Sequence, residues 1–171
     1  LNYLGSLMQS VFIQVIGTVQ GVGFRPFVYN LALKYDIKGW VNNDEKGVNI
    51  LLSSSEANIQ NFINELKSNP PILARIDSIN IEKITEIKEY KTFEIIQSES
   101  SKNKSTIISP DIAICDDCIE DINDMSNFRY SYSLTNCTNC GPRYSIIKTI
   151  PYDRINTSMF SFELCEKCKN E

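Results

Sequence analysis

The sequence predicts an α+β fold, with a sheet layered on two helices, followed by a small region built around paired cysteines. Short β-branched and aromatic runs alternate with two amphipathic helical patterns up to about residue 97. All six cysteines come later, in three Cys-x-x-Cys pairs after residue 114. A chain of 171 residues is long enough for two small domains, and the segregated cysteines favour that division.

The first element is an apolar run over residues 11–16, which predicts a central strand buried on both faces. A loop with three glycines follows, from Gly17 to Pro26. Glycine allows positive φ angles and lets the backbone approach a ligand closely. The loop leads into a helix predicted from Pro26 to Lys34, with proline at the first helical position. Because helix N-termini attract anions, this loop is a candidate phosphoryl site.

A β-hairpin and a second helix come next. Residues 37–42 and 48–52 predict two strands joined by a tight connection at Lys46-Gly47. Ser53 and Glu56 match a capping box, and apolar side chains then recur at helical spacing until an Asn-Pro-Pro sequence ends the helix. The hairpin therefore lies between the two predicted helices.

Residues 76–84 and 92–96 predict the last strands, one of them short. The resulting order is βαββαβ with one more short strand, the ferredoxin-like arrangement, in which both helices cover one face of an antiparallel sheet. This domain is expected over residues 9–97. Residues 98–110 are polar and serine-rich and predict a linker, and residues 111–171 form the cysteine-containing region.

Charge and composition exclude several classes of function. Residues 1–97 carry 9 basic against 10 acidic side chains and residues 98–171 carry 8 against 11, so neither half is a basic nucleic-acid platform. The absence of histidine removes imidazole bases and histidine-ligated metals. No apolar run reaches the length of a membrane span, and no secretory signal is recognisable. We expect a cytoplasmic protein and assign no function to Leu1–Leu7.

The cysteine pairs indicate a zinc site. Cys115 and Cys118 are separated by eighteen residues from Cys137 and Cys140, a spacing typical of two knuckles that hold one tetrahedral ion. The alternatives to a metal site are disulfides or free thiols. Stable disulfides are disfavoured in a cytoplasmic chain, and two pairs at this distance favour zinc, with a redox or iron site as the remaining metal alternative. A closed site of four thiolates is structural rather than catalytic.

The third pair, Cys165 and Cys168, has no fourth pair before the sequence ends. From spacing alone, these cysteines either join the first site in another combination or find their partners beyond residue 171.

Two motifs in the first domain resemble the signatures of the acylphosphatase family. They read Gly-Thr-Val-Gln-Gly-Val-Gly-Phe-Arg over residues 17–25 and Gly-Trp-Val-Asn-Asn over residues 39–43, with Gly47 beyond. The resemblance implies that Arg25 binds the phosphoryl group and that Asn43, rather than its neighbour Asn42, orients the attacking water. The residues of the phosphate-binding loop are Gln20, Gly21, Val22, Gly23 and Phe24.

The chemistry of these residues agrees with such roles. An acyl phosphate is a reactive mixed anhydride, so its hydrolysis needs charge stabilisation and a positioned water more than a general acid. Loop amides and Arg25 would stabilise the phosphoryl oxygens. Asn43 would hold the water, because a neutral amide both donates and accepts hydrogen bonds.

The cysteine region resembles the zinc-finger region of the HypF family of hydrogenase-maturation carbamoyltransferases. The resemblance rests on the motifs around the first two cysteine pairs and on Pro-Tyr-Asp-Arg at residues 151–154. It implies one complete finger over about residues 115–140 and a second, truncated one that begins at Cys165. It further implies carbamoyl phosphate as substrate, ATP for domains outside this sequence, the partner protein HypE, and supply of cyanide ligands to NiFe hydrogenases.

Two other functions deserve comparison. The chain could be a zinc-dependent interaction module with an inactive phosphate-binding domain, which phosphate binding without hydrolysis would favour. A nucleic-acid-binding zinc ribbon is disfavoured because both halves are acidic and a four-thiolate zinc site adds further negative charge.

Overall fold

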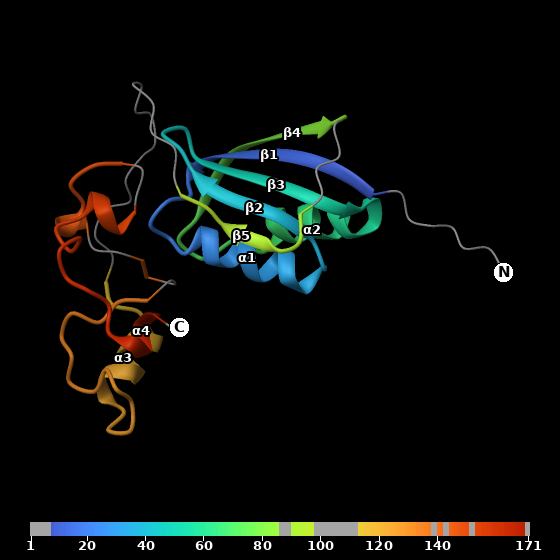
Figure 1. Ribbon diagram of the computed structural model, residues 1–171. Helices are drawn as coiled ribbons and strands as arrows, with labels where there is room; N and C mark the ends of the chain where they lie inside the picture. Colours follow the sequence, from blue (N-terminus) through green and yellow to red (C-terminus); the bar gives the residue numbers. More distant parts are fainter. Residues whose placement is uncertain are drawn as a thin grey trace.

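The computed structural model describes residues 8–85, 90–97, 113–137, 140–141, 144–150 and 153–169, the side chains of 168 and 169 excepted. Figure 1 shows a sheet-and-helix domain and, beside one end of its sheet, a loop-rich part that we call the cysteine module, residues 113–169. The predicted linker, residues 98–110, and the first seven residues lie outside the described part of the chain.

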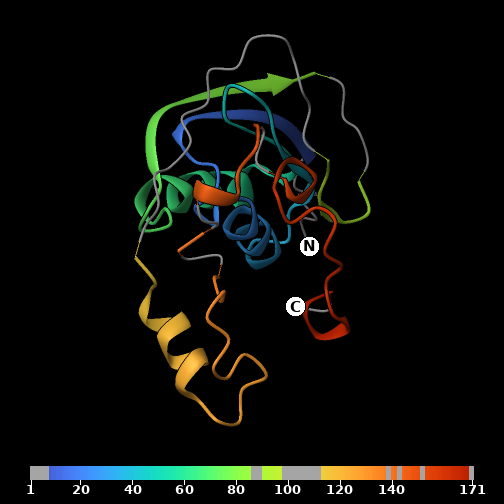
Figure 2. The same ribbon diagram turned by 90° about the vertical axis from the view of Figure 1, so that its left-hand side faces the viewer.

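In the first domain the described residues form one mixed sheet of five strands in the order β4-β1-β3-β2-β5. Neighbouring strands are antiparallel except β2 and β5, which are parallel. Both long helices cover the same face of the sheet (Figures 1 and 2). The predicted ferredoxin-like α+β arrangement is confirmed, with β5 as the additional short strand. The elements are β1 (Met8–Thr18), α1 (Phe24–Lys34), β2 (Lys38–Asn43), β3 (Val48–Ser55), α2 (Glu56–Ser68), β4 (Arg75–Ile84) and β5 (Phe93–Ile95).

The core lies between the sheet and the helices. On β1, Val11, Ile13 and Val15 are buried against the helices, whereas Phe12 and Gln14 on the opposite face are only half buried. The prediction that this strand is buried on both faces is therefore wrong, because α1 and α2 both pack on one side. Each fully buried aliphatic side chain contributes roughly 1.5–3 kcal/mol of hydrophobic stabilisation.

Helix α2 begins later than its capping pattern predicts. Ser53 lies within β3, opposite Ser10 of β1, and the N-cap is Ser55, whose side chain accepts a hydrogen bond from the Asn58 amide at 3.3 Å. The strand continues to Ser55 because β1 pairs with it as far as Met8. A local capping pattern cannot reveal that long-range pairing.

Replacing Ser55 with alanine is expected to lower the free energy of unfolding by about 1 kcal/mol, because one amide of the first turn of α2 loses its acceptor. Chemical denaturation followed by circular dichroism measures this loss. Ser68→Ala, at the exposed last position of the same helix, is the matched control. Equal stabilities of the two variants would contradict the capping role.

Helix α1 begins at Phe24, two residues before the predicted start. Its N-cap is Gly23, with φ 71°, and the Phe27 amide donates to the Gly23 carbonyl at 3.1 Å. Pro26 is tolerated inside the first turn because amides there have no partner within the helix. The glycine-rich loop therefore joins the helix directly, and Arg25 becomes the second residue of α1.

The far end of α1 is tied to α2. Glu65 accepts hydrogen bonds from Lys34 Nζ at 2.6 and 2.8 Å and from the Tyr35 hydroxyl at 2.5 Å. These hydrogen bonds, that from Lys34 first, lower the pKa of Glu65 below its ordinary value. The tie therefore stabilises the fold at neutral pH and weakens as the pH falls through that lowered pKa.

The cysteine module contains little regular structure. Its described residues form two short helices, α3 (Asp116–Asn123) and α4 (Glu166–Lys169), and two 3-10 turns, η1 (Tyr144–Ile146) and η2 (Arg154–Asn156). Cys118, Cys140 and Thr157 are buried, whereas several large apolar side chains are exposed. A module with so small an apolar interior needs another source of stability. None of the helices described here is long and apolar enough to cross a lipid bilayer.

Candidate active site and metal centre

The loop between β1 and α1 is anchored by two valines and shaped by glycines. Val19 and Val22 are buried in the core, while Gly21 and Gly23 both have φ 71°. Gly21, Gly23 and the first turn of α1 line a cavity of about 760 Å³. The positive end of the α1 dipole therefore points into this cavity, which favours an anion there.

Gln20 connects the loop to the β2–β3 hairpin. Its Nε2 atom donates to the carbonyl of Asp44 at 2.6 Å and to that of Gly47 at 3.0 Å. The Asp44 carboxylate in turn accepts hydrogen bonds from the backbone amides of Lys46 and Gly47 at 2.7 and 2.8 Å, which closes the turn. The Gln20 amide thus fixes the hairpin relative to the loop, a structural role that adds to its predicted place in a phosphate-binding loop.

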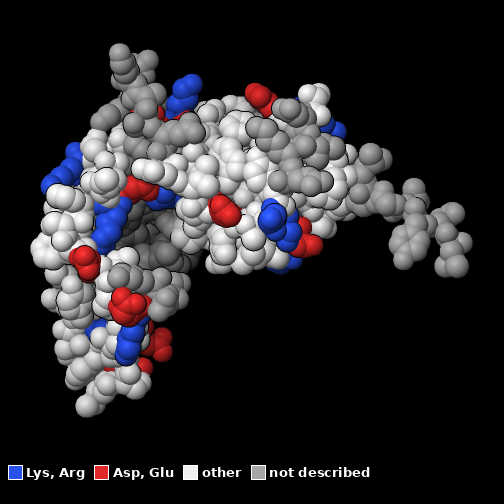
Figure 3. Space-filling view, viewed as in Figure 1, with Lys and Arg blue, Asp and Glu red and all other residues white. Residues whose placement is uncertain are grey.

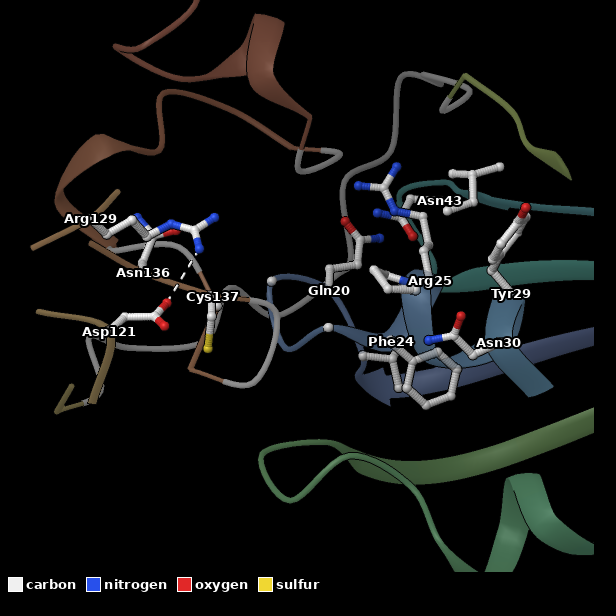
Figure 4. Close-up of a pocket in the computed structure, with 16 residues that line it drawn as sticks. Gln20, Phe24, Arg25, Tyr29, Asn30, Asn43, Asp121, Arg129, Asn136 and Cys137 are labelled. Carbon is white, nitrogen blue, oxygen red and sulfur yellow. Dashed lines mark hydrogen bonds and ion pairs between the residues drawn. The ribbon is translucent and has the colours of Figure 1, made fainter. Parts of the chain in front are cut away.

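Asn43 is the last residue of β2 and lines the same cavity as Arg25. Figure 4 shows its side chain next to the Arg25 guanidinium. The side chain is almost completely buried, and its Oδ1 atom has no hydrogen-bond partner within the described part of the chain. A buried acceptor of this kind is suited to hold a water or a ligand donor. Asn42, the alternative, does not line the cavity.

The opposite wall of the cavity comes from the cysteine module. Asp121, Arg129, Asn136, Cys137 and Gly141 line it, and Arg129 Nη1 donates to Asp121 Oδ2 at 3.3 Å (Figure 4). Cys137 was predicted as a zinc ligand, but none of these residues was predicted to line this cavity, because the two modules are distant along the chain. Tyr29 and Asn30 also line the cavity and were not predicted to do so. They follow Arg25 by about one helical turn, so helical spacing could have identified them.

Arg25 has a partner that sequence reasoning missed. Its Nη1 atom donates to Asp153 Oδ1 at 2.6 Å, across 128 positions of the sequence. Both side chains are largely shielded, with 18% and 22% of their surfaces exposed. Asp153 belongs to the Pro-Tyr-Asp-Arg motif, yet nothing in that motif indicates a contact with the first domain.

The predicted zinc ligands come together in a cluster. The sulfur atoms of Cys115, Cys118, Cys137 and Cys140 all lie within 4.8 Å of one another. The Cys115–Cys137, Cys118–Cys140 and Cys137–Cys140 sulfur pairs are 3.4, 3.7 and 3.9 Å apart. In a tetrahedral zinc–thiolate site with bonds of about 2.3 Å, the sulfur atoms stand about 3.8 Å apart. The four residues therefore fit a four-coordinate metal, and none of them forms a disulfide.

Burial raises the pKa of the Cys118 thiol, and hydrogen bonds with the neighbouring cysteines raise it further. The first cause is that burial removes water from the charged thiolate form, and repulsion between Cys118 and Cys140 adds to it. A divalent cation at their centre would offset that repulsion. Cys165, in contrast, is exposed just before α4 and is outside the cluster, and the side chain of Cys168 lies outside the described residues.

Acidic and basic side chains are interspersed on the face shown in Figure 3, over both parts of the molecule. The described residues of that face form no broad area of a single charge, as the sequence composition indicates.

Comparison with known proteins finds a separate family model for each of the two modules. The family model for acylphosphatases matches residues 11–95, and the model for the HypF finger matches residues 114–147. An acylphosphatase of Listeria monocytogenes is 40% identical over 88 residues, which are 51% of this chain and 95% of that protein. The first domain is thus similar to a whole acylphosphatase.

Longer relatives share both modules. The probable carbamoyltransferase HypF of Methanocaldococcus jannaschii is 51% identical over 147 residues, 85% of this chain and 19% of that protein. Carbamoyltransferase HypF2 of Cupriavidus necator is 44% identical over 90% of this chain and 19% of its own length. The chain therefore spans about a fifth of the length of these curated relatives.

Solved structures agree with the sequence relatives. The crystal structure of full-length HypF in the phosphate- and nucleotide-bound form has a TM-score of 0.93 at 46% identity, over 99% of this chain and 22% of that one. The crystal structure of HypF from T. kodakarensis has a TM-score of 0.82 at 43% identity, over 95% of this chain and 20% of that one. The chain therefore belongs to the acylphosphatase family, and with its cysteine module it corresponds to the N-terminal region of the HypF carbamoyltransferases.

Proposed function

We propose that this chain hydrolyses acyl phosphates, and carbamoyl phosphate in particular, at the cavity lined by Arg25 and Asn43. The observation that supports this most strongly is that residues of two separate sequence motifs line the same cavity. An arginine at a helix N-terminus and a buried amide oxygen without a partner among the described residues, from separate signatures of the acylphosphatase family, line one cavity. Both residue types suit a phosphoryl group and its attacking water.

In the proposed mechanism the phosphoryl group sits between the loop amides of residues 20–24 and the Arg25 guanidinium. These donors stabilise the charge that accumulates on the phosphoryl oxygens. Asn43 Oδ1 accepts a hydrogen bond from a water and aims its oxygen at phosphorus. The new P–O bond forms as the bond to the acyl oxygen breaks, carbamate leaves with the bonding electron pair, and the water proton passes to solvent.

The metal at the four-cysteine cluster is, in this proposal, zinc with a structural role. The donor set of four thiolates and their sulfur separations favour zinc, and four protein ligands leave no open position for catalysis. Cys115, Cys118, Cys137 and Cys140 would hold it. The ion would supply the stability that the small apolar interior of the module lacks.

For a protein that extends this chain to the length of its relatives, we propose the activity in the relatives' names, which is carbamoyl transfer. The carbamate released here would then serve a carbamoyltransferase whose other domains use ATP to activate it, with HypE as acceptor protein and NiFe hydrogenase maturation in the cytoplasm as the destination. The shared domain order and the identity to proteins named carbamoyltransferase HypF support this extension.

Replacing Asn43 with alanine is expected to lower kcat for carbamoyl phosphate hydrolysis by roughly a hundredfold, because the water loses its acceptor while the phosphoryl donors remain. A phosphate-release assay with carbamoyl and acetyl phosphate measures this. Asn42→Ala is the matched control: its amide is equally buried, makes no hydrogen bond within the described residues and does not line the cavity. Equal activity of both variants would refute the role of Asn43.

A second candidate is a zinc-dependent interaction module. The cysteine module exposes large side chains that usually pack against other protein, including Tyr132, Leu134 and Phe162. Binding of phosphate by wild-type protein without hydrolysis of any acyl phosphate would favour this function over the first.

A further inference from the structure

One charged side chain of the cysteine module, Asp153, is hydrogen-bonded directly to Arg25 of the proposed active site. Asp153 Oδ1 accepts a hydrogen bond from Arg25 Nη1 at 2.6 Å. Because each side chain exposes less than a quarter of its surface, water screens this pair less than it screens an ion pair on the surface. The orientation of the phosphoryl-binding arginine therefore depends on a residue of another module.

Asp153 is itself held by a compact turn. The Asn156 amide donates to the Asp153 carbonyl at 2.8 Å, and Thr157, which is buried, pairs with Ile147 in an isolated β-bridge. The Thr157 hydroxyl donates to the Arg154 carbonyl at 2.7 Å. These bonds fix the backbone around residue 153, so its carboxylate is presented from a defined position rather than from a loose loop.

A second contact fixes the module against the loop. Gly141 has φ 67°, and a side chain there would collide with the backbone carbonyl of Gly21. Two backbones can approach this closely only where glycine removes the Cβ atom. The module therefore lies directly against the proposed phosphate-binding loop at a place separate from the Arg25–Asp153 pair.

We infer that Asp153 is a positioning residue for Arg25, which the cysteine module supplies to complete the proposed acyl phosphate site; this inference rests on the proposed function. An arginine side chain has many rotamers, and a carboxylate on one Nη atom selects the few that are compatible with that bond. Orientation matters most in the transition state, where donors must meet developing charge. The negative charge of Asp153 repels an anionic substrate and so weakens its binding. The orientation that Asp153 gives Arg25 strengthens binding, so the two effects on substrate affinity oppose each other.

The inference predicts a specific kinetic signature for Asp153→Asn in the 171-residue chain. We expect kcat for carbamoyl phosphate to fall by about tenfold or more, because misoriented donors lose transition-state stabilisation. We expect KM to change by less than about threefold, because the lost orientation and the lost repulsion offset each other. Asp153→Glu, which keeps the carboxylate, should recover much of the loss. Glu163→Gln, an exposed carboxylate in the same module, is the matched control.

A double-mutant cycle separates positioning from general damage. In an Arg25→Ala background, Asp153→Asn should have no further effect on kcat, because Asp153 acts only through Arg25. Additive losses would contradict the inference. An unchanged kcat in Asp153→Asn would also overturn it, and an increased kcat would show that the carboxylate competes with the phosphoryl group instead.

A spectroscopic readout keeps this inference distinct from the proposed function. The guanidinium NMR signals of Arg25 should report restricted rotation in wild-type protein and in Asp153→Glu, and faster rotation in Asp153→Asn. If the wild-type chain hydrolyses no acyl phosphate, the proposed function fails, and these signals still decide whether Asp153 holds Arg25. If Arg25→Ala abolishes hydrolysis while Asp153→Asn changes neither kcat nor the signals, only the inference fails.

Discussion

Replacing Arg25 with alanine is expected to lower kcat/KM for carbamoyl phosphate hydrolysis by about a hundredfold to a thousandfold. The guanidinium is the charged side chain of the loop that lines the cavity, and it lies in the first turn of α1, where the helix dipole also favours an anion. Its planar fork can donate two hydrogen bonds to one phosphoryl group. Steady-state phosphate release, with folding checked by circular dichroism, measures the loss.

Two further variants sharpen this result. Arg25→Lys should be intermediate, because lysine retains the charge but presents it as a point rather than as a fork. Arg75→Ala is the control for removing an arginine, since Arg75 lies on β4 with 67% of its side chain exposed and pairs with Asp77. A fully active Arg25→Ala variant would eliminate the proposed site. Loss of activity in Arg75→Ala would point to a general effect of charge or stability.

Replacing Cys140 with serine is expected to reduce bound zinc from about one ion per chain to nearly none, and to unfold the cysteine module. Cys140 is buried, and its sulfur lies 3.7 Å from that of Cys118 and 3.9 Å from that of Cys137. Serine cannot replace the thiolate as a soft ligand, and the module has little apolar interior of its own. Metal content after dialysis, together with limited proteolysis, measures both effects.

Cys165→Ser is the matched control for the metal. Cys165 is exposed and outside the four-sulfur cluster, so its loss should leave the zinc content and the protease resistance of the first finger unchanged. Equal zinc content in the Cys140 and Cys165 variants would contradict the assignment of the four ligands. If the Cys140 variant also lost acyl phosphate hydrolysis, the result would agree with a module that completes the active site.

Much of the site followed from residues that are close in sequence. The loop that ends in Arg25 and the hairpin that carries Asn43 were both predictable, because glycines, apolar runs and a tight turn determine such elements locally. The clustering of Cys115, Cys118, Cys137 and Cys140 was predictable for the same reason, since each pair forms one knuckle.

The remaining features depend on packing between distant segments. The true N-cap, Ser55, reflects pairing of β3 with β1, and the parallel strand β5 reflects pairing with β2. Neither partner is encoded in the local pattern. The contact of Asp153 with Arg25 needs the cysteine module to lie against the loop, and Gly141 permits that approach. A site shared by two modules is therefore the part that sequence reasoning missed.

The most direct test of the central claim is hydrolysis of carbamoyl phosphate by the 171-residue chain in water enriched in oxygen-18. If water held by Asn43 attacks a phosphorus atom bound by Arg25, each phosphate released by the protein carries one solvent oxygen. Spontaneous breakdown through cleavage of the carbon–oxygen bond gives unlabelled phosphate. Labelled phosphate from the wild-type protein, lost in Arg25→Ala, is the predicted result; unlabelled phosphate at the uncatalysed rate would contradict it.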